Sequence, residues 1–167
     1  ITNVLILHVW SIYRRGSDGM TSLIFGVALL VAIGRNSELV VHVGVWFIAL
    51  QSLLSYCGNG LTKIGAPDWR AGTAVLDIFR DRTYGSPGAV LLLENRPIVS
   101  KMLSWSMVVM EIAFPIVLLS GWVGCAVFLA WGVLFHAASV VLLGLNSFFW
   151  AYVATYPAIV WASLQVQ

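Results

Sequence analysis

The stretch that decides the fold is residues 122–145, WVGCAVFLAWGVLFHAASVVLLGL, which contains no Asp, Glu, Lys or Arg. One helical crossing of a bilayer needs about 20 predominantly apolar residues. This stretch is apolar on every face of a helix, whereas a strand of a transmembrane barrel alternates polar and apolar residues. It therefore predicts a membrane-spanning helix.

The composition of the whole chain agrees with that prediction. Of its 167 residues, 60% are hydrophobic and only 10% are charged, whereas soluble domains carry about 25% charged residues. The net charge of +2 and the lack of a basic stripe argue against a nucleic-acid partner. Two cysteines are too few for a disulfide framework.

Six apolar runs follow one another along the chain, and a chain of this length holds five to six helical spans. The runs cover residues 1–13, 20–33, 39–61, 102–121, 122–145 and 147–165. We therefore expect an all-α protein, a polytopic transmembrane helical bundle of five to six spans, in which residues 1–167 form a single bundle. Pro157 should kink the last run or tip it into the interface. Because Ile1 lies inside an apolar run, we expect the sequence to be a fragment of a longer chain.

The long connection between the third and fourth runs, residues 63–101, is more polar than the rest of the chain. Residues 73–79, TAVLDIF, and residues 87–95, PGAVLLLEN, each predict a short helix, the second with Ser86 as its cap and Pro87 at its first position. We expect these short helices to lie along the membrane surface, with Trp69 and Tyr84 as interface anchors.

The basic residues gather on one side of the membrane if the runs cross it alternately. Of the nine Lys and Arg residues, Arg14, Arg15 and the six in the 63–101 connection are expected on one side of the membrane, and only Arg35 on the other. We call this side the charged face. The positive-inside rule predicts that it faces the cytoplasm, and we expect the bilayer to be a bacterial inner membrane.

Polar residues inside the apolar runs are costly and pose a question of partner or function. On the third run, Ser52, Tyr56, Asn59 and Lys63 fall within roughly 60° of each other around the helix. Such a stripe serves either hydrogen bonding between helices, which is common in membrane bundles, or a functional site.

Polar residues on other apolar runs are expected at similar depths in the bilayer. At about 1.5 Å per residue, Glu111 and His136 each lie roughly 14 Å below the charged face. By the same measure Tyr56 lies at about 11 Å, His8 at about 8 Å and Asn59 at about 6 Å. Four separate helices thus carry polar groups in one half of the bilayer, which predicts a polar cavity open to the charged face.

Glu111 at this depth is expected to be protonated or paired, because an isolated carboxylate is costly in hydrocarbon. Its candidate partners are His136 and Lys63, and a buried pair with His136 could serve only to fix helix register. Lys63 either snorkels to the interface or turns into the cavity, where it could act as a general base.

The residues by themselves identify no cofactor. Bis-histidine ligation of haem needs two imidazoles facing each other at one depth; His8 and His136 could meet this need only by a shift in depth, and His42 lies near the opposite face. No apolar run carries two histidines. The pattern therefore favours neither haem nor chlorophyll, and we predict no metal site.

Residues 56–72, YCGNGLTKIGAPDWRAG, resemble the signature of the HTTM family, which includes the vitamin K-dependent γ-glutamyl carboxylases. A second, weaker resemblance covers EIAFPIVLL at 111–119 and FHAASVVLLGLNSFFWAYVATYPAI at 135–159. The matching positions are Tyr56, Gly58, Gly60, Lys63, Ile64, Asp68, Trp69, Gly72, Glu111, Pro115, Phe135, His136, Gly144, Phe148 and Pro157.

The resemblance implies a catalytic role for Lys63, as the base that deprotonates a quinol, with Glu111 and His136 in the same cavity. Tyr56, Asn59, Trp69 and His8 are then the expected cofactor-binding residues. The carboxylases also have a large soluble domain that holds their peptide substrate, and these 167 residues contain none. A quinol-dependent reaction on another substrate therefore stays open. The carboxylases act on the lumenal side, opposite to the orientation that the charge count predicts.

The alternative is a non-catalytic transmembrane subunit of a larger respiratory or photosynthetic membrane complex. Eight Trp and eight Phe residues provide flat apolar contacts for neighbouring helices, pigments or lipids. In both interpretations the lipid bilayer is a partner, and the sequence leaves open whether the protein is an enzyme.

Overall fold

The computed structural model describes residues 16–167, and this part of the chain is helical throughout, without a strand. The first apolar run, residues 1–13, and the candidate site residue His8 lie outside the described residues. In chain order the described helices are α2 (Gly16–Ile33), α3 (Glu38–Gly65), α4 (Pro67–Ala71), α5 (Ala74–Phe79), α6 (Pro87–Leu93), α7 (Pro97–Ala113), the 3₁₀ helix η1 (Phe114–Leu118), α8 (Gly121–Leu143), α9 (Asn146–Val153) and α10 (Tyr156–Val166).

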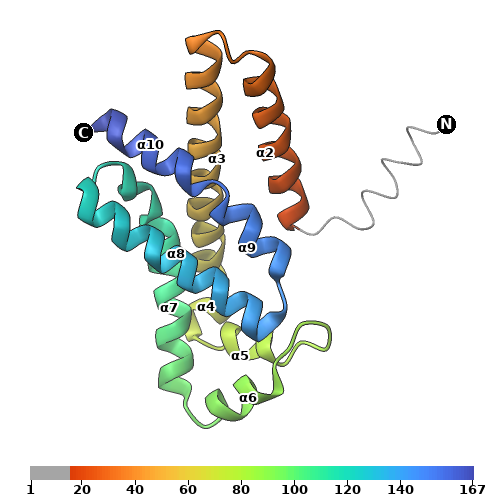
Figure 1. Ribbon diagram of the computed structural model, residues 1–167. Helices are drawn as coiled ribbons and strands as arrows, with labels where there is room; N and C mark the ends of the chain where they lie inside the picture. The colour runs from red at the N-terminus through yellow and green to blue at the C-terminus, as the bar shows by residue number, and fades with distance from the viewer. Residues whose placement is uncertain (1–15) are drawn as a thin grey trace, which may run out of the picture.

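The long helix α3 organises the others, as Figure 1 shows. The helix α2 runs antiparallel beside its first half, and the short helices α4, α5 and α6 gather at its carboxyl end (Figure 1). From there α7 leads back along α3, while α8, α9 and α10 cross the bundle and complete the core.

Three stretches of the described chain are long and apolar enough to cross a membrane: α3, α7 together with η1, and α8. This agrees with the predicted transmembrane helical class. The apolar part of α2, Asp18–Ile33, is shorter. The last apolar run is divided into α9 and α10, and the break directly precedes Pro157, which lies in the first turn of α10. Proline fits that position because the first turn of a helix does not need its N–H.

The two helices that carry the candidate residues differ in length from the predicted runs. The helix α3 continues four residues beyond the predicted end at residue 61, so that Lys63 lies in its last turn. It stops at Ala66, whose extended backbone (φ −87°, ψ 130°) is the conformation favoured before Pro67.

The fourth run begins at Pro97, five residues before the predicted start, and its α-helical part ends at Ala113. Pro115 lacks the N–H that would bond to the carbonyl of Glu111 in a continuing α-helix, and the N–H of Phe114 bonds to that carbonyl instead. The chain consequently tightens into η1.

The 63–101 connection forms a small helical layer of its own. The helices α5 and α6 match the predicted short helices, and Ser86 and Pro87 take the predicted cap and first positions of α6, although the Ser86 side chain makes no capping bond. The helix α4 was not expected from the sequence. A second apolar cluster, formed by Val75, Phe79, Ala89 and Leu93, joins α5 to α6.

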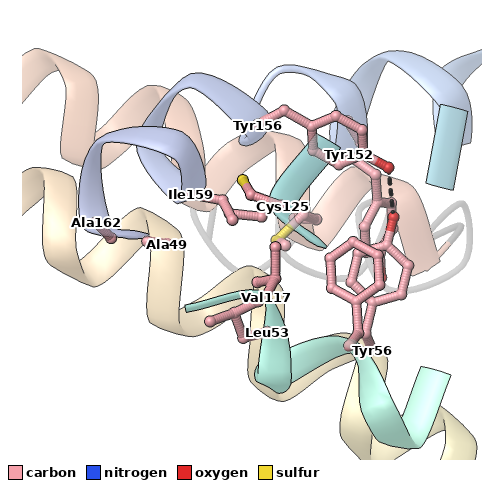
Figure 2. Packing of buried hydrophobic residues seen from close by; sticks show 12 residues of the cluster. Ala49, Leu53, Tyr56, Val117, Cys125, Tyr152, Tyr156, Ile159 and Ala162 are labelled. Carbon is pink, nitrogen blue, oxygen red and sulfur yellow. Dashed lines mark hydrogen bonds between the residues drawn. The ribbon is translucent and has the colours of Figure 1, made fainter. Parts of the chain in front are cut away.

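The main core lies where α3, η1, α8, α9 and α10 meet. Figure 2 shows this cluster, which includes Leu53 of α3, Val117 of η1 and Ile159 of α10. At its edge the rings of Tyr56 and Tyr156 point toward one another, and a hydrogen bond joins their hydroxyl groups (Figure 2). The apolar core therefore ends in a polar cluster.

Candidate functional site

Three of the described helices bring four of the predicted site residues together. Tyr56 and Lys63 come from α3, where a spacing of two helical turns places them on one face. Glu111 lies near the end of α7, and His136 lies in the second half of α8. The stripe and depth arguments therefore pointed to side chains that are neighbours in space.

Lys63 and Glu111 form an ion pair. The distance from Lys63 Nζ to Glu111 Oε1 is 2.5 Å, and the side chains are 20% and 3% exposed. Of the two partners that the sequence left open for Glu111, the structure places Lys63 at the carboxylate. The interpretation of a Glu111–His136 pair that fixes register is therefore wrong, and Lys63 turns inward instead of snorkelling.

A close approach of two helices makes this ion pair possible. Gly60 lies one turn before Lys63 on α3, where it faces α7. A Cβ atom added at Gly60 would lie 2.8 Å from the backbone nitrogen of Ile112 and 3.0 Å from Glu111 Cβ. Only a residue without a side chain leaves room for α7 at this distance.

Aromatic rings surround the Lys63 ammonium. Its Nζ lies 4.8 Å from the ring centroid of Trp69 and 5.8 Å from that of Phe135, distances at which a cation is attracted to a ring face. Phe135 in turn stacks on Trp131, with ring centroids 5.2 Å apart. The predicted site residue Trp69 thus lies beside Lys63, and it is carried by α4, the helix that was not expected from the sequence.

Tyr56 connects His136 to the last helix. Its hydroxyl lies 2.6 Å from His136 Nε2 and 2.8 Å from the Tyr156 hydroxyl. The Tyr56 ring stacks on Phe114 with centroids 3.9 Å apart, and the His136 ring stacks on Tyr152 at 4.8 Å. These contacts hold the imidazole in one orientation.

The network extends to the exposed edge of α3 through Tyr152. The Tyr152 hydroxyl lies 2.6 Å from Ser55 Oγ. The predicted site residue Asn59 is exposed, and within residues 16–167 no hydrogen bond joins it to Lys63 or Glu111. Tyr152 and Tyr156 were missed in the sequence, although their spacing of four residues in an apolar run indicates one helix face.

Two buried atoms of this cluster have unused hydrogen-bonding capacity. Within residues 16–167, Glu111 Oε2 and His136 Nδ1 have no hydrogen-bond partner. Buried polar atoms are nearly always bonded, and each one that is not costs roughly 1–3 kcal/mol. A polar ligand that reached these atoms would recover that free energy.

The described residues contain no group of three or more His, Cys, Asp and Glu side chains that could hold a metal ion. The cluster itself contains an amine, a carboxyl group, an imidazole and phenols beside aromatic rings. No family model, curated protein or solved structure matches this chain.

Proposed function

We propose that this chain is the membrane part of an HTTM-type enzyme in which Lys63 removes a hydroxyl proton from a lipid-soluble quinol. The observation that carries the proposal is the Lys63–Glu111 ion pair, which lies at the end of a spanning helix and is largely buried. A salt bridge that served stability alone would gain little at such a position, because desolvation offsets most of the attraction between the charges.

The ion pair can supply a base without any other group. Burial penalises both charges, and moving one proton from Lys63 to Glu111 leaves a neutral amine beside a neutral acid. The amine then accepts the proton of a quinol hydroxyl, which yields a quinolate and restores the ammonium. Glu111 thus stores the proton that Lys63 must release beforehand.

The surrounding rings suit a flat substrate. Trp69 and Phe135 face the ammonium from α4 and α8, and they offer apolar surface on which a quinol ring can stack. Tyr56 and His136 lie deeper, and within residues 16–167 the buried His136 Nδ1 has no hydrogen-bond partner. In this proposal Lys63 and Glu111 react, while the aromatic residues position the substrate.

The proposal includes the placement of the chain in a bacterial inner membrane. The six apolar runs of the full sequence correspond to five to six spans, with α4, α5 and α6 in the interface and the charged face in the cytoplasm. Leu91 and Leu92 are strongly exposed on α6. Apolar side chains directed outward from a short surface helix support its insertion into the headgroup region.

The deciding experiment distinguishes the role of Lys63 as a base from its role in the ion pair. Arginine keeps the charge at position 63 but does not lose its proton, so Lys63→Arg retains the pair and abolishes proton abstraction. Purified protein in lipid nanodiscs is supplied with a naphthoquinol carrying an isoprenoid tail, and oxygen consumption reports the quinolate. We expect a rate above background for the wild type and the background rate for Lys63→Arg.

The matched control is Arg82→Lys, because Arg82 is exposed in the α5–α6 loop; we expect it to keep the wild-type rate. Binding of the oxidised naphthoquinone is followed separately by quenching of tryptophan fluorescence. Oxygen uptake by Lys63→Arg at the wild-type rate, or the absence of any quinone binding by the wild type, would exclude this function.

A second function, that of a non-catalytic subunit in a larger membrane complex, is favoured by the surface of α8. This helix exposes most of its length, and the exposed fraction reaches 74% at Trp122 and 82% at Val141. Such a face packs against lipid or against another protein. Stoichiometric co-purification with partner subunits in a mild detergent would support the second function, and recovery of a free monomer would contradict it.

A further inference from the structure

The α2–α3 hairpin carries a groove far from the Lys63 cluster. It has a volume of about 500 Å³, and only apolar residues line it, among them Leu30, Leu39, Val43 and Phe47. The two helices are in contact at Gly44, where an added Cβ would overlap Val31. The groove opens beside this contact and is exposed along most of its lining.

The depth of the groove can be stated relative to the bilayer. The 28 residues of α3 extend about 42 Å at about 1.5 Å per residue, which matches the 40–45 Å of a bilayer with its headgroups. With Lys63 near one interface, the turn at residues 34–37 lies near the other. The groove begins directly below this turn and extends about 12 Å from Leu39 to Phe47.

One basic side chain, Arg35, lies in the α2–α3 turn at the end of the groove. Arg35 lies in the turn between α2 and α3, between the groove residues Leu30 and Leu39 in the sequence, and makes no ion pair with any residue of 16–167. The other basic residues of the described chain lie beyond Gly60: Lys63, Arg70, Arg80, Arg82, Arg96 and Lys101. Arg35 is therefore the one Lys or Arg of the described residues at this end of α3, where Glu38 in the first turn of α3 is the neighbouring acid, and its guanidinium is not used in an ion pair within residues 16–167.

From this arrangement we infer that the hairpin binds one phospholipid, with an acyl chain in the groove and the phosphate on Arg35. A guanidinium binds phosphate through two parallel hydrogen bonds and suits a headgroup better than any neutral side chain would. The acyl chain covers apolar surface on two helices at once, so it is held more strongly than a lipid on a single helix face. This site is independent of the proposed chemistry at Lys63.

The test uses the whole chain in phosphatidylcholine vesicles that contain a trace of phosphatidylglycerol with a diazirine on its acyl chain. After irradiation, mass spectrometry maps the labelled peptides. We expect labelling to concentrate in residues 27–47. A diacylglycerol probe with the same diazirine but without phosphate should label this segment at least about tenfold less, as the loss of the charge-assisted hydrogen bonds to Arg35 predicts.

Two variants and two matched controls complete the design. Arg35→Gln removes the phosphate partner and should lower labelling of residues 27–47 about tenfold. Val43→Trp fills the groove and should also lower this labelling, because the acyl chain no longer fits. Arg82→Gln removes an arginine from the charged face, and Val127→Trp adds a ring on α8 at a position 59% exposed, compared with 58% for Val43. Both controls should leave the labelling unchanged.

Three results would overturn the inference. One is equal labelling of residues 27–47 by the two probes. Another is labelling that Arg35→Gln does not change, which shows bulk lipid contact only. The third is the absence of label from this segment while α8 is labelled, which shows that protein covers the groove.

Discussion

Lys63 shows how much a single side chain depends on its surroundings. A lysine at the end of an apolar run commonly directs its ammonium toward the headgroups. Here the carboxylate of Glu111 lies within reach on a neighbouring helix, and the rings of Trp69 and Phe135 cover the ammonium. The side chain therefore stays in the bundle, and each charge depends on the other.

This dependence predicts an asymmetric response to substitution. Lys63→Met leaves the Glu111 carboxylate buried without a partner, and should destabilise the protein by about 3–5 kcal/mol. The double variant Lys63→Met, Glu111→Gln removes both charges and should recover most of that loss. The stabilities of the wild type, the single variant and the double variant are compared by thermal unfolding in the same detergent, followed by circular dichroism.

The control for this comparison is Lys101→Met, since Lys101 is an exposed lysine of the same connection; its stability should equal that of the wild type. A Lys63→Met variant as stable as the wild type would show that the ion pair contributes nothing to the fold.

Among the helices, the crossing of α3 and α7 matters most for the site. It is close because Gly60 faces the backbone of Ile112, and this proximity brings Glu111 to Lys63. A glycine inside a helix costs up to about 1 kcal/mol relative to alanine. Gly60 is retained at that cost because the neighbouring helix occupies the space of a side chain.

Two alanine substitutions on α3 distinguish packing from helix propensity. Gly60→Ala places a methyl group against α7, and should cost about 1–3 kcal/mol of unfolding free energy because the crossing must widen. Gly58→Ala meets nothing within 4 Å, and should stabilise the helix by up to about 1 kcal/mol. Denaturant titration of both variants checks the difference in sign, and equal effects would contradict the close approach.

The loop between α5 and α6 predicts a pH response outside the spanning helices. Asp81 Oδ1 accepts hydrogen bonds from the N–H groups of Thr83 at 2.7 Å and Tyr84 at 3.0 Å. These donors hold the pKa of the Asp81 carboxyl below its usual range. The turn should therefore be stable above about pH 4 and weaken as the pH falls through the lowered pKa.

Amide chemical shifts of Thr83 and Tyr84, followed by NMR during an acid titration, measure this response. Asp81→Asn should abolish the titration of both amides, whereas Asp77→Asn should preserve it. Amides that titrate identically in the Asp81→Asn variant would show that the carboxylate is not their acceptor.

In the described part of the molecule, the basic residues are distributed unequally between the two ends of α3. Arg35 precedes its amino end, whereas the layer of α4, α5 and α6 lies at its carboxyl end (Figure 1). If α3 crosses the bilayer, these two ends face different compartments, and the positive-inside rule assigns the layer with most of the arginines to the cytoplasm.

Cysteine labelling from one side tests this orientation. In a chain with Cys57→Ala and Cys125→Ala, a membrane-impermeant maleimide added to intact cells should react with Arg35→Cys and not with Arg82→Cys. Permeabilised cells should show both reactions. Labelling of both positions in intact cells would mean that α3 does not cross the membrane.

The sequence determined the local features of this protein. Apolar runs of sufficient length and prolines at their ends specified most helices and their approximate bounds, because hydrophobicity and backbone restriction act within a few residues. The same runs placed Tyr56, Glu111 and His136 at similar depths, and the polar stripe on the third run added Lys63. The helix α4 escaped notice because five residues are too few to show a helical period.

Only the tertiary structure decided which polar groups pair. Depth along a helix axis does not specify rotation about that axis, so the sequence left Glu111 with two candidate partners. The close approach of α7 at Gly60 brings Glu111 to Lys63. Tyr56 lies within hydrogen-bonding distance of both the Tyr156 hydroxyl of α10 and His136 Nε2, so His136 pairs with Tyr56 and not with Glu111. Pairing depends on distances of a few ångströms between separate helices, and packing alone sets those distances.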